Sequence, residues 1–291
     1  MTRRACAYAT ADSARTGLVR SRVSAMVLAA LCCASCGVPL LKLPPGPGVP
    51  AADAGDILSQ ATAACGSIRT LTAEVAVSGS AGRRRVSGRL LVGVAVPASA
   101  RLEAVAPFGP PMFIFVAGGD DATLLLPRDD RVLEHGPPDA VLEAVTGAPL
   151  GAADLRALLT GCALPAAEAD GRRVGEDWRV VGRSTGDEIF LRRVDRVWRL
   201  VAATRRRGSR VWREEYRDHV NGLPRALRLV SLDASGGAGT TFDLRLALSQ
   251  VEANVTLDEA VFRVQIPGAA RAITLDELRQ SGPLAAGADG R

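Results

Sequence analysis

The sequence contains few of the side chains that carry chemistry in enzymes and metal proteins. It has 2 histidines, His135 and His219, and neither lies at metal-ligand spacing from cysteines or carboxylates. Glu214 and Glu215 are neighbours in a predicted strand and therefore point to opposite faces, which does not suit a paired acid and base. The sequence thus predicts no catalytic residue, no metal site and no cofactor, and we expect no enzyme activity.

The chain also lacks a long apolar run near its N-terminus. Arg20 and Arg22 precede a short apolar stretch, residues 23–31, which cannot span a bilayer and has the form of a secretory signal peptide. The stretch leads to Cys33-Ala34-Ser35-Cys36, which resembles the lipobox of bacterial lipoproteins, although Cys33 stands where leucine is usual. We predict a signal peptide at residues 1–35 and a lipid on Cys36, with an ordinary signal peptide as the alternative.

The predicted lipid would also determine where the protein resides. Gly37, which follows the lipidated cysteine, is not acidic, so no retention signal for the inner membrane is evident. In a double-membraned cell this favours the outer membrane, with the protein lipid-anchored and facing the periplasm. The inner membrane remains the alternative.

An excess of one charge is absent from the predicted mature chain. The full sequence has 36 basic and 31 acidic residues. Five arginines and one aspartate fall within residues 1–35, which leaves 31 basic and 30 acidic residues. This balance removes the compositional reason to expect a nucleic acid partner.

Cysteine is scarce beyond the predicted leader. Three of the 6 cysteines belong to residues 1–35 and Cys36 is predicted to carry the lipid, so Cys65 and Cys162 remain. In an oxidising compartment such a pair can form a disulfide, which here would join the end of the first helix to the end of a mid-chain helix. Two buried free thiols are the alternative.

The chain divides into segments of different composition. Residues 36–52 are rich in proline and glycine and read as a tether. Apolar residues at helical spacing predict a first helix from Ala54 to Ile68 and two shorter helices at 140–145 and 152–160. The predicted domain covers residues 53–270, and residues 271–291 form a tail to which the sequence assigns no role.

Most of the domain shows the two-residue period of β-strands. The predicted strands cover residues 71–78, 84–96, 100–106, 112–117, 122–126, 131–135, 178–183, 188–194, 197–206, 210–217, 225–233 and 240–252. Short turns between them favour a mainly β (α+β) fold with a single large curved antiparallel sheet whose mouth is covered by the mid-chain helices. The arginine triplets at 83–85 and 205–207 are read as solvated hairpin tips, with anionic headgroups as an alternative contact.

Several segments are similar to a known family. They are Ala106-Pro107-Phe108-Gly109, residues 142–150, residues 154–161, Asn221-Gly222-Leu223-Pro224, residues 254–258 and residues 262–267. These segments resemble the LolA/LolB superfamily, and in particular outer-membrane lipoprotein receptors of the LolB type. The resemblance implies an unclosed half-barrel with a helical lid, a cavity for the acyl chains of lipids or lipoproteins, and a periplasmic lipoprotein carrier as a partner.

The resemblance also implies which residues line the cavity. These are Val75, Val77, Leu90, Val92, Phe113, Phe115, Leu125, Leu142, Leu155, Leu158, Trp198 and Leu200. The alternative is a non-catalytic sensor or scaffold module whose barrel is filled by its own side chains. A wide apolar cavity would favour the first function, whereas a barrel plugged by Trp198, Phe190 or Trp212 would favour the second.

One loop is expected to contact a membrane or the cargo. Three prolines and a glycine between residues 106 and 112 prevent strand pairing, and the loop still carries Phe108 and Met112. In the similar family a hydrophobic residue in the matching loop helps to insert lipoproteins into the membrane, which implies this role for Phe108. The alternative is that Phe108 folds back and caps the barrel.

Overall fold

The computed structural model describes residues 39–162, 169–183, 185–233 and 235–281. The predicted signal peptide, residues 1–35, and the predicted lipid-attachment residue Cys36 lie outside these ranges. The chain divides into a unit of residues 1–40 and a unit of residues 41–291, and the fold described below is that of the second unit. Within the described ranges, no helix combines the length and the apolar character needed to cross a membrane.

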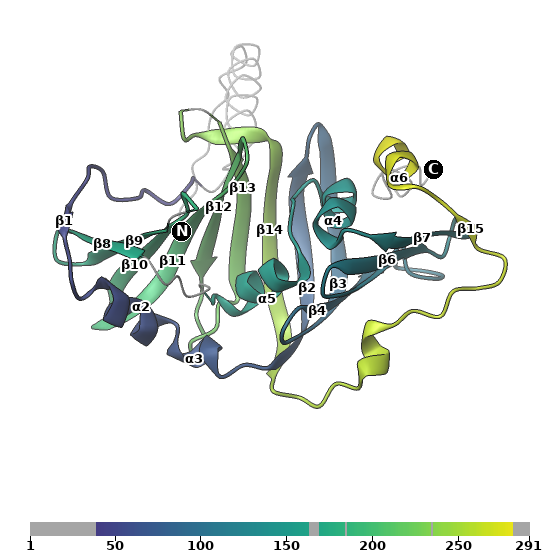
Figure 1. Cartoon of the computed structure of the whole chain (residues 1–291), viewed down its shortest axis with the longest axis horizontal. Coiled ribbons are helices and arrows are strands. Elements are labelled where there is room, and N and C mark those ends of the chain that lie inside the picture. The colour runs from purple at the N-terminus through teal and green to yellow at the C-terminus, as the bar shows by residue number, and fades with distance from the viewer. Residues whose placement is uncertain (1–38, 163–168, 184, 234, 282–291) are drawn as a thin grey trace, which may run out of the picture. The chain divides into compact units, whose positions relative to one another are not determined.

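The described residues of this unit form one 15-stranded sheet (Figure 1). The strands follow the order β1-β8-β9-β10-β11-β12-β13-β14-β2-β3-β4-β5-β6-β7-β15, and all neighbours are antiparallel except β7 and β15. The first and last strands of this order do not pair, so the sheet stays open. The predicted mainly β fold with a single unclosed sheet is confirmed.

The strands have the following bounds: β1 (Val49–Pro50), β2 (Thr70–Ala81), β3 (Arg84–Ala95), β4 (Ser99–Val105), β5 (Ile114–Gly118), β6 (Asp121–Leu126), β7 (Arg131–Gly136), β8 (Ala169–Val174), β9 (Trp178–Arg183), β10 (Glu188–Val194), β11 (Val197–Arg207), β12 (Arg210–Arg217), β13 (Ala226–Leu232), β14 (Ala238–Ala253) and β15 (Arg271–Ala272).

The sheet consists of two meanders that meet in its middle. Strands β2 to β7 form the first and β8 to β14 the second, and β14 pairs with β2. The end of the first meander therefore lies far across the sheet from the start of the second. The helices α4 (Pro138–Thr146) and α5 (Ala152–Thr160) belong to the connection between β7 and β8.

One face of the sheet is apolar across many strands, and we call it the inner face. A row of directly paired, buried residues crosses the first meander from β2 to β7: Ala73, Val92, Leu102, Phe115, Leu124 and Leu133. Side chains alternate between the faces of a strand, so the residues between them point to the opposite, outer face. The inner face must be covered to bury this surface.

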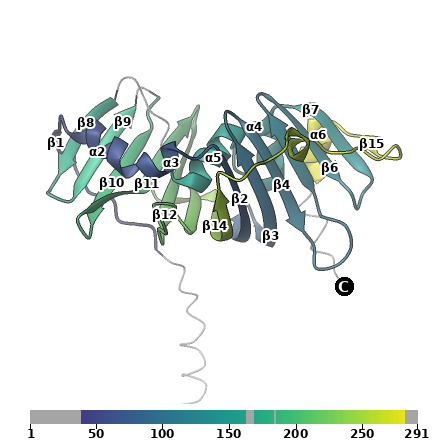
Figure 2. The same ribbon diagram turned by 90° about the horizontal axis from the view of Figure 1, so that it is seen from below.

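Helices provide this cover (Figure 2). The helix α2 (Ala54–Ala61) packs on β8 to β11, and α3 (Ala63–Gly66) follows it directly. The helix α5 packs on β3 and β4, and α4 packs on β6. Gly147 and Gly161 end α4 and α5 in the left-handed conformation that favours glycine. We call α4, α5 and the residues between them the lid.

Two extended segments cross the outer face. Residues 41–50 run from the outer face of β9 to β12 to the edge of the sheet, where β1 pairs with β8. Residues 254–270 cross the outer face of β4 and β5 and include the short 3-10 helix η1 (Glu259–Phe262). Arg101 donates hydrogen bonds to the carbonyls of Val261 and Arg263, each over 3.2 Å, which holds this second segment.

Residues after 270 extend the fold. The strand β15 pairs in parallel with β7, and α6 (Leu275–Ser281) packs on α4, where Leu278 is fully buried. The sequence predicted neither of these elements, nor β8. The predicted first helix from Ala54 to Ile68 is divided at Thr62 into α2 and α3.

The two arginine triplets have different environments. Arg83, Arg84 and Arg85 are exposed around the turn between β2 and β3, as predicted for a hairpin tip. For residues 205–207 the prediction is wrong at Arg205, which retains only 12% of its side-chain exposure and pairs with buried carboxylates, whereas Arg206 and Arg207 are exposed. Arg207 instead points to the lid and pairs with its carboxylates.

Candidate functional site

Most of the predicted cavity residues lie on the inner face or on the lid. Val75, Val77, Leu90, Val92, Phe113 and Phe115 come from the sheet and its loops, and Leu142, Leu155 and Leu158 come from the lid. All of them belong to one hydrophobic core. Phe113 and Phe115 are 2% and 0% exposed, so the side chains of the protein itself fill the space under the lid.

One predicted cavity residue lies on the opposite face and two lie away from the lid. Leu125 is buried on the outer face, because its strand neighbours Leu124 and Leu126 take the inner face. Trp198 and Leu200 belong to the same core on the inner face, but they lie on β11, where α2 covers the sheet. They belong to the second meander, and the sequence could not show which helix covers which meander.

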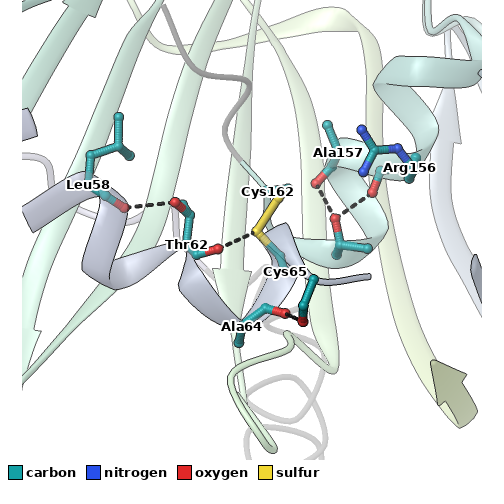
Figure 3. The surroundings of a disulfide bond; sticks show 9 residues. Leu58, Thr62, Ala64, Cys65, Arg156, Ala157 and Cys162 are labelled. Carbon is teal, nitrogen blue, oxygen red and sulfur yellow. Dashed lines mark hydrogen bonds between the residues drawn. A yellow bond between two sulfur atoms is a disulfide. The ribbon is translucent and has the colours of Figure 1, made fainter. Parts of the chain in front are cut away.

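The lid is fixed at its end by a disulfide. Cys65 on α3 and Cys162, which follows α5, are bonded and their Cα atoms are 5.5 Å apart (Figure 3). Of the two alternatives for these cysteines, the structure therefore has the disulfide and not two buried free thiols. The bond ties the lid to the helix pair α2 and α3, whose cover extends over the other meander.

Charged side chains hold the rest of the lid. Arg207 pairs with Asp139 over 3.3 Å and with Asp154 over 2.9 Å, and it donates to the carbonyl of Pro149 over 3.0 Å. Arg210 pairs with Glu143. Both arginines are about half exposed, and exposed pairs contribute only about 0–1 kcal/mol each. These contacts position the lid without locking it.

A buried polar cluster lies on the inner face of β11 and β12. Glu214 accepts hydrogen bonds from Trp212 Nε1 over 3.2 Å, from Tyr216 Oη over 2.7 Å and from Arg205 Nε over 3.2 Å. Arg205 also lies 3.6 Å from Asp187. Both oxygens of Glu214 are thus engaged within the protein, which suits a structural role.

The protonation of this cluster follows from its surroundings. Burial disfavours the charge on Arg205, but Glu214 and Asp187 outweigh burial and raise the pKa of the guanidinium above its ordinary value. Burial and the neighbouring Glu214 raise the pKa of Tyr216, which therefore stays neutral. The sequence analysis missed this cluster. The pattern that could have indicated it is the alternation of Trp212, Glu214 and Tyr216, which places a carboxylate between two aromatic residues on a face that otherwise carries core residues.

The loop after β4 exposes one aromatic side chain. Phe108 is 88% exposed, and Arg128 fixes the loop by donating to the carbonyls of Phe108 and Pro110 over 2.8 Å and 3.2 Å. Phe108 therefore does not cap the barrel. Met112 differs from the expectation: it is partly buried and packs against the core, because its backbone is already hydrogen-bonded to Ala104.

The described residues show no arrangement suited to metal binding. They contain no group of three or more His, Cys, Asp or Glu that could hold a metal ion. Burial and Arg199 lower the pKa of His219, so this ring is neutral at pH 7. Gly182-Arg183-Ser184-Thr185-Gly186 has the letters of a nucleophile elbow, which the sequence analysis overlooked, but it joins the antiparallel strands β9 and β10, not a strand and a helix. Ser184 itself lies outside the described residues.

A groove lies on the outer face of the described residues. It has a volume of about 340 Å³ and is lined by residues of β14, β2, β3 and β4, with Val261 at its side. Its lining mixes apolar groups with Thr72, Glu74, Arg101, Glu103 and Glu252. This groove lies on the opposite face of the sheet from the apolar cavity that the sequence predicted.

Solved structures with a similar fold exist. A LolA superfamily protein, NE2245 from Nitrosomonas europaea, shares 13% identity over 72% of this chain and 97% of its own, with a TM-score of 0.47. A putative outer membrane lipoprotein-sorting protein domain from Vibrio parahaemolyticus shares 12% identity over 71% and 94%, with a TM-score of 0.47. A DUF1329 family protein from Desulfovibrio piger shares 12% identity over 74% and 98%, with a TM-score of 0.48.

These similarities concern the fold alone. The first of them is described as a LolA superfamily protein, and none of the three is named as a LolB protein. No family model matches the sequence, and no curated protein matches it. What this chain binds has to be argued from its own residues.

The disulfide generates a first prediction. In the chain-entropy model, closing a loop with a sequence separation of 97 stabilises the fold by up to about 4 to 5 kcal/mol. We expect the variant C65S/C162S to lose a large part of this amount in chemical denaturation. Thiol labelling of the unfolded, unreduced wild type should find neither cysteine, and two labelled thiols would contradict the bond.

The buried polar cluster generates a second prediction. Glu214→Ala removes a carboxylate from a buried pair and leaves Arg205 with Asp187 alone, so we expect a loss of about 3–5 kcal/mol in the free energy of unfolding. Asp177→Ala, which breaks an exposed pair with Arg193, is the matched control and should change stability by less than about 1 kcal/mol. If both changes lowered the free energy of unfolding equally, the buried cluster would contribute no more to stability than an exposed ion pair.

Proposed function

We propose that this protein is an envelope lipoprotein that binds the acyl chains of lipids or lipoproteins between the inner face of its sheet and its lid. The observation that carries this proposal is the construction of the lid. Its inner side is apolar, with Leu142, Val145 and Leu158 buried on the sheet. The disulfide at Cys162 fixes one end of the lid, whereas its other polar attachments are half-exposed arginines. Such a lid can separate from the sheet at little electrostatic cost.

An acyl chain suits the space that opens between lid and sheet. A chain that enters there is covered by apolar surface on both sides, so the lid does not expose its leucines to water. Each methylene that leaves water contributes about 0.8 kcal/mol. Gly147 and Gly161, at the ends of α4 and α5, allow backbone rotation where a lid needs hinges.

In this proposal the lipid on Cys36 anchors the protein to the outer membrane, on the periplasmic side. A periplasmic lipoprotein carrier would deliver the cargo, and exposed Phe108 would contact the bilayer or an acyl chain during transfer. No bond is made or broken in this function. The apolar core between the sheet and the lid supports a binding role.

A second candidate function is a sensor or scaffold module that binds a protein partner and holds no lipid. A specific observation favours it: the inner face is filled by the chain's own side chains, among them Phe113, Phe115 and Trp212. The two functions differ in whether the lid ever leaves the sheet.

A locked lid separates these functions. A Cβ built on Gly147 would lie 3.5 Å from the Cβ of Ala81 on β2, within the range for a disulfide. We expect wild-type protein to retain lipids from native membranes, detected by mass spectrometry, and to take up a fluorescent fatty acid. The oxidised variant A81C/G147C should lose uptake at least about tenfold, because the chain can no longer pass under the lid.

The single variants A81C and G147C are the matched controls, since they carry the same local strain without the lock. Both should take up the fatty acid like the wild type. Uptake by the locked form would refute lid opening. Absence of lipid and of uptake in the wild type would support the self-filled module.

Phe108 provides a separate test of the role in transfer. Because Phe108 is 88% exposed, Phe108→Glu should change the free energy of unfolding by less than about 0.5 kcal/mol. The same change at buried Phe113 should lower stability by several kcal/mol. We expect F108E to bind fatty acid normally and to transfer it to vesicles more slowly. A large drop in the melting temperature of F108E, or unchanged transfer, would contradict this role.

A further inference from the structure

The outer face of the second meander carries more basic than acidic side chains. By strand alternation it presents eight arginines against five carboxylates, Asp170, Glu188, Glu215, Asp243 and Glu252. The arginines are Arg172, Arg192, Arg199, Arg206, Arg213, Arg217, Arg228 and Arg245. The predicted mature chain has nearly equal numbers of basic and acidic residues, but this face thus carries an excess of basic ones.

Ion pairs within the face account for three of the five carboxylates. Glu188 pairs with Arg172, Glu215 with Arg217, and Asp243 with Arg228. The described part of the chain offers no carboxylate pair to Arg192, Arg199 or Arg206. Arg192 and Arg199 are direct cross-strand partners, so two like charges lie side by side. Like charges in this position are unfavourable unless an anion is near.

The start of the domain is fastened to this same face. Leu41 and Leu43 pack on an apolar cluster of Val180, Phe190, Val201 and Ala202. The backbone N–H of Leu41 donates to Glu215 Oε1 over 2.7 Å, and Arg213 donates to the Leu41 carbonyl over 3.3 Å. Glu215 has no exposed side-chain surface, so this contact is built into the fold. Residues after Leu40 are therefore not a free tether.

This attachment limits how far the face can lie from a membrane. Leu41 lies five positions after Cys36, the predicted lipid-attachment site, and five steps between consecutive Cα atoms span at most about 18 Å. A lipid on Cys36 must therefore hold the point where Leu41 binds within that distance of the bilayer surface. The basic face surrounds this point.

From the short reach and the charge we infer that the outer face of β9 to β14 docks on the anionic headgroups of the bilayer that holds the lipid anchor. The arginines bind lipid phosphates, and the lid on the inner face points away from the membrane. This inference rests on the proposed lipid at Cys36, and it adds an orientation and a lipid class that the proposed function does not specify.

The orientation can be measured on the acylated protein in vesicles. With the lipid on Cys36 and the disulfide formed, an introduced cysteine is the one reactive thiol of the mature chain. Ser78→Cys lies exposed on the outer face, paired with Arg245, and Ser59→Cys lies exposed on α2 at the inner side. Both changes replace serine, so the two variants form a matched pair.

The test compares vesicles of phosphatidylcholine alone with vesicles that also contain phosphatidylglycerol, which is anionic. We expect a membrane-impermeant maleimide to label S78C at least about tenfold more slowly on the anionic vesicles. The reason is that each arginine near an anionic surface changes the equilibrium constant for docking about fivefold. S59C should react equally on both vesicles. High salt should restore the labelling of S78C by screening the headgroup charge.

Charge removal completes the test. In the S78C background, R192Q/R199Q/R206Q should abolish the protection, whereas R83Q/R84Q/R85Q, which removes the same charge from the exposed hairpin tip, should leave it intact. Equal labelling of S78C and S59C, or equal effects of the two triple variants, would overturn the inference. Fatty acid uptake measured on the same samples reports the proposed function independently, so either idea can fail alone.

Discussion

The pairing of β14 with β2 is the constraint on which the rest of the structure depends. It joins two antiparallel meanders into a single sheet, so one continuous apolar face has to be covered. Because β7 and β8 lie in opposite halves of this sheet, the connection between them must cross it, and the helices α4 and α5 lie on that connection. The helices that bury the core are thus the same helices that could uncover it.

The lid combines strong and weak attachments. The disulfide at Cys162 is covalent and the apolar contacts are extensive, whereas the contacts of Arg207 and Arg210 with the lid are half exposed. A hinged cover needs this asymmetry, because one end must stay in place while the other moves. The fully engaged Glu214 cluster, in contrast, rigidifies the neighbouring strands.

The two faces of the sheet serve different purposes in this view. The inner face is apolar and suits hydrocarbon, whereas the outer face of the second meander is basic and suits phosphate. Strand alternation produces this division at no cost in chain length, since each strand contributes to both faces. Leu41, fixed by Glu215 and Arg213, links the basic face to the N-terminal segment.

Local patterns in the sequence determined the strands, the lid helices and their ends. The period of two in β2 and the stop at Gly161 depend on neighbouring residues alone, so they could be predicted. The short strand β15 could not, because its partner β7 is distant in sequence. The face of the sheet on which Leu125 lies could not be predicted either, because it depends on the register between neighbouring strands.

Contacts between residues far apart in sequence were decided by the tertiary structure alone. The sequence could name Cys65 and Cys162 but left their state open, and it could not show that Leu41 meets Glu215, 174 positions away. It also placed Arg205 in solvent, although the pairing of β11 with β12 brings it to Glu214. A charge is stable in such a buried place only when its partner is present, and the register of the sheet supplies that partner.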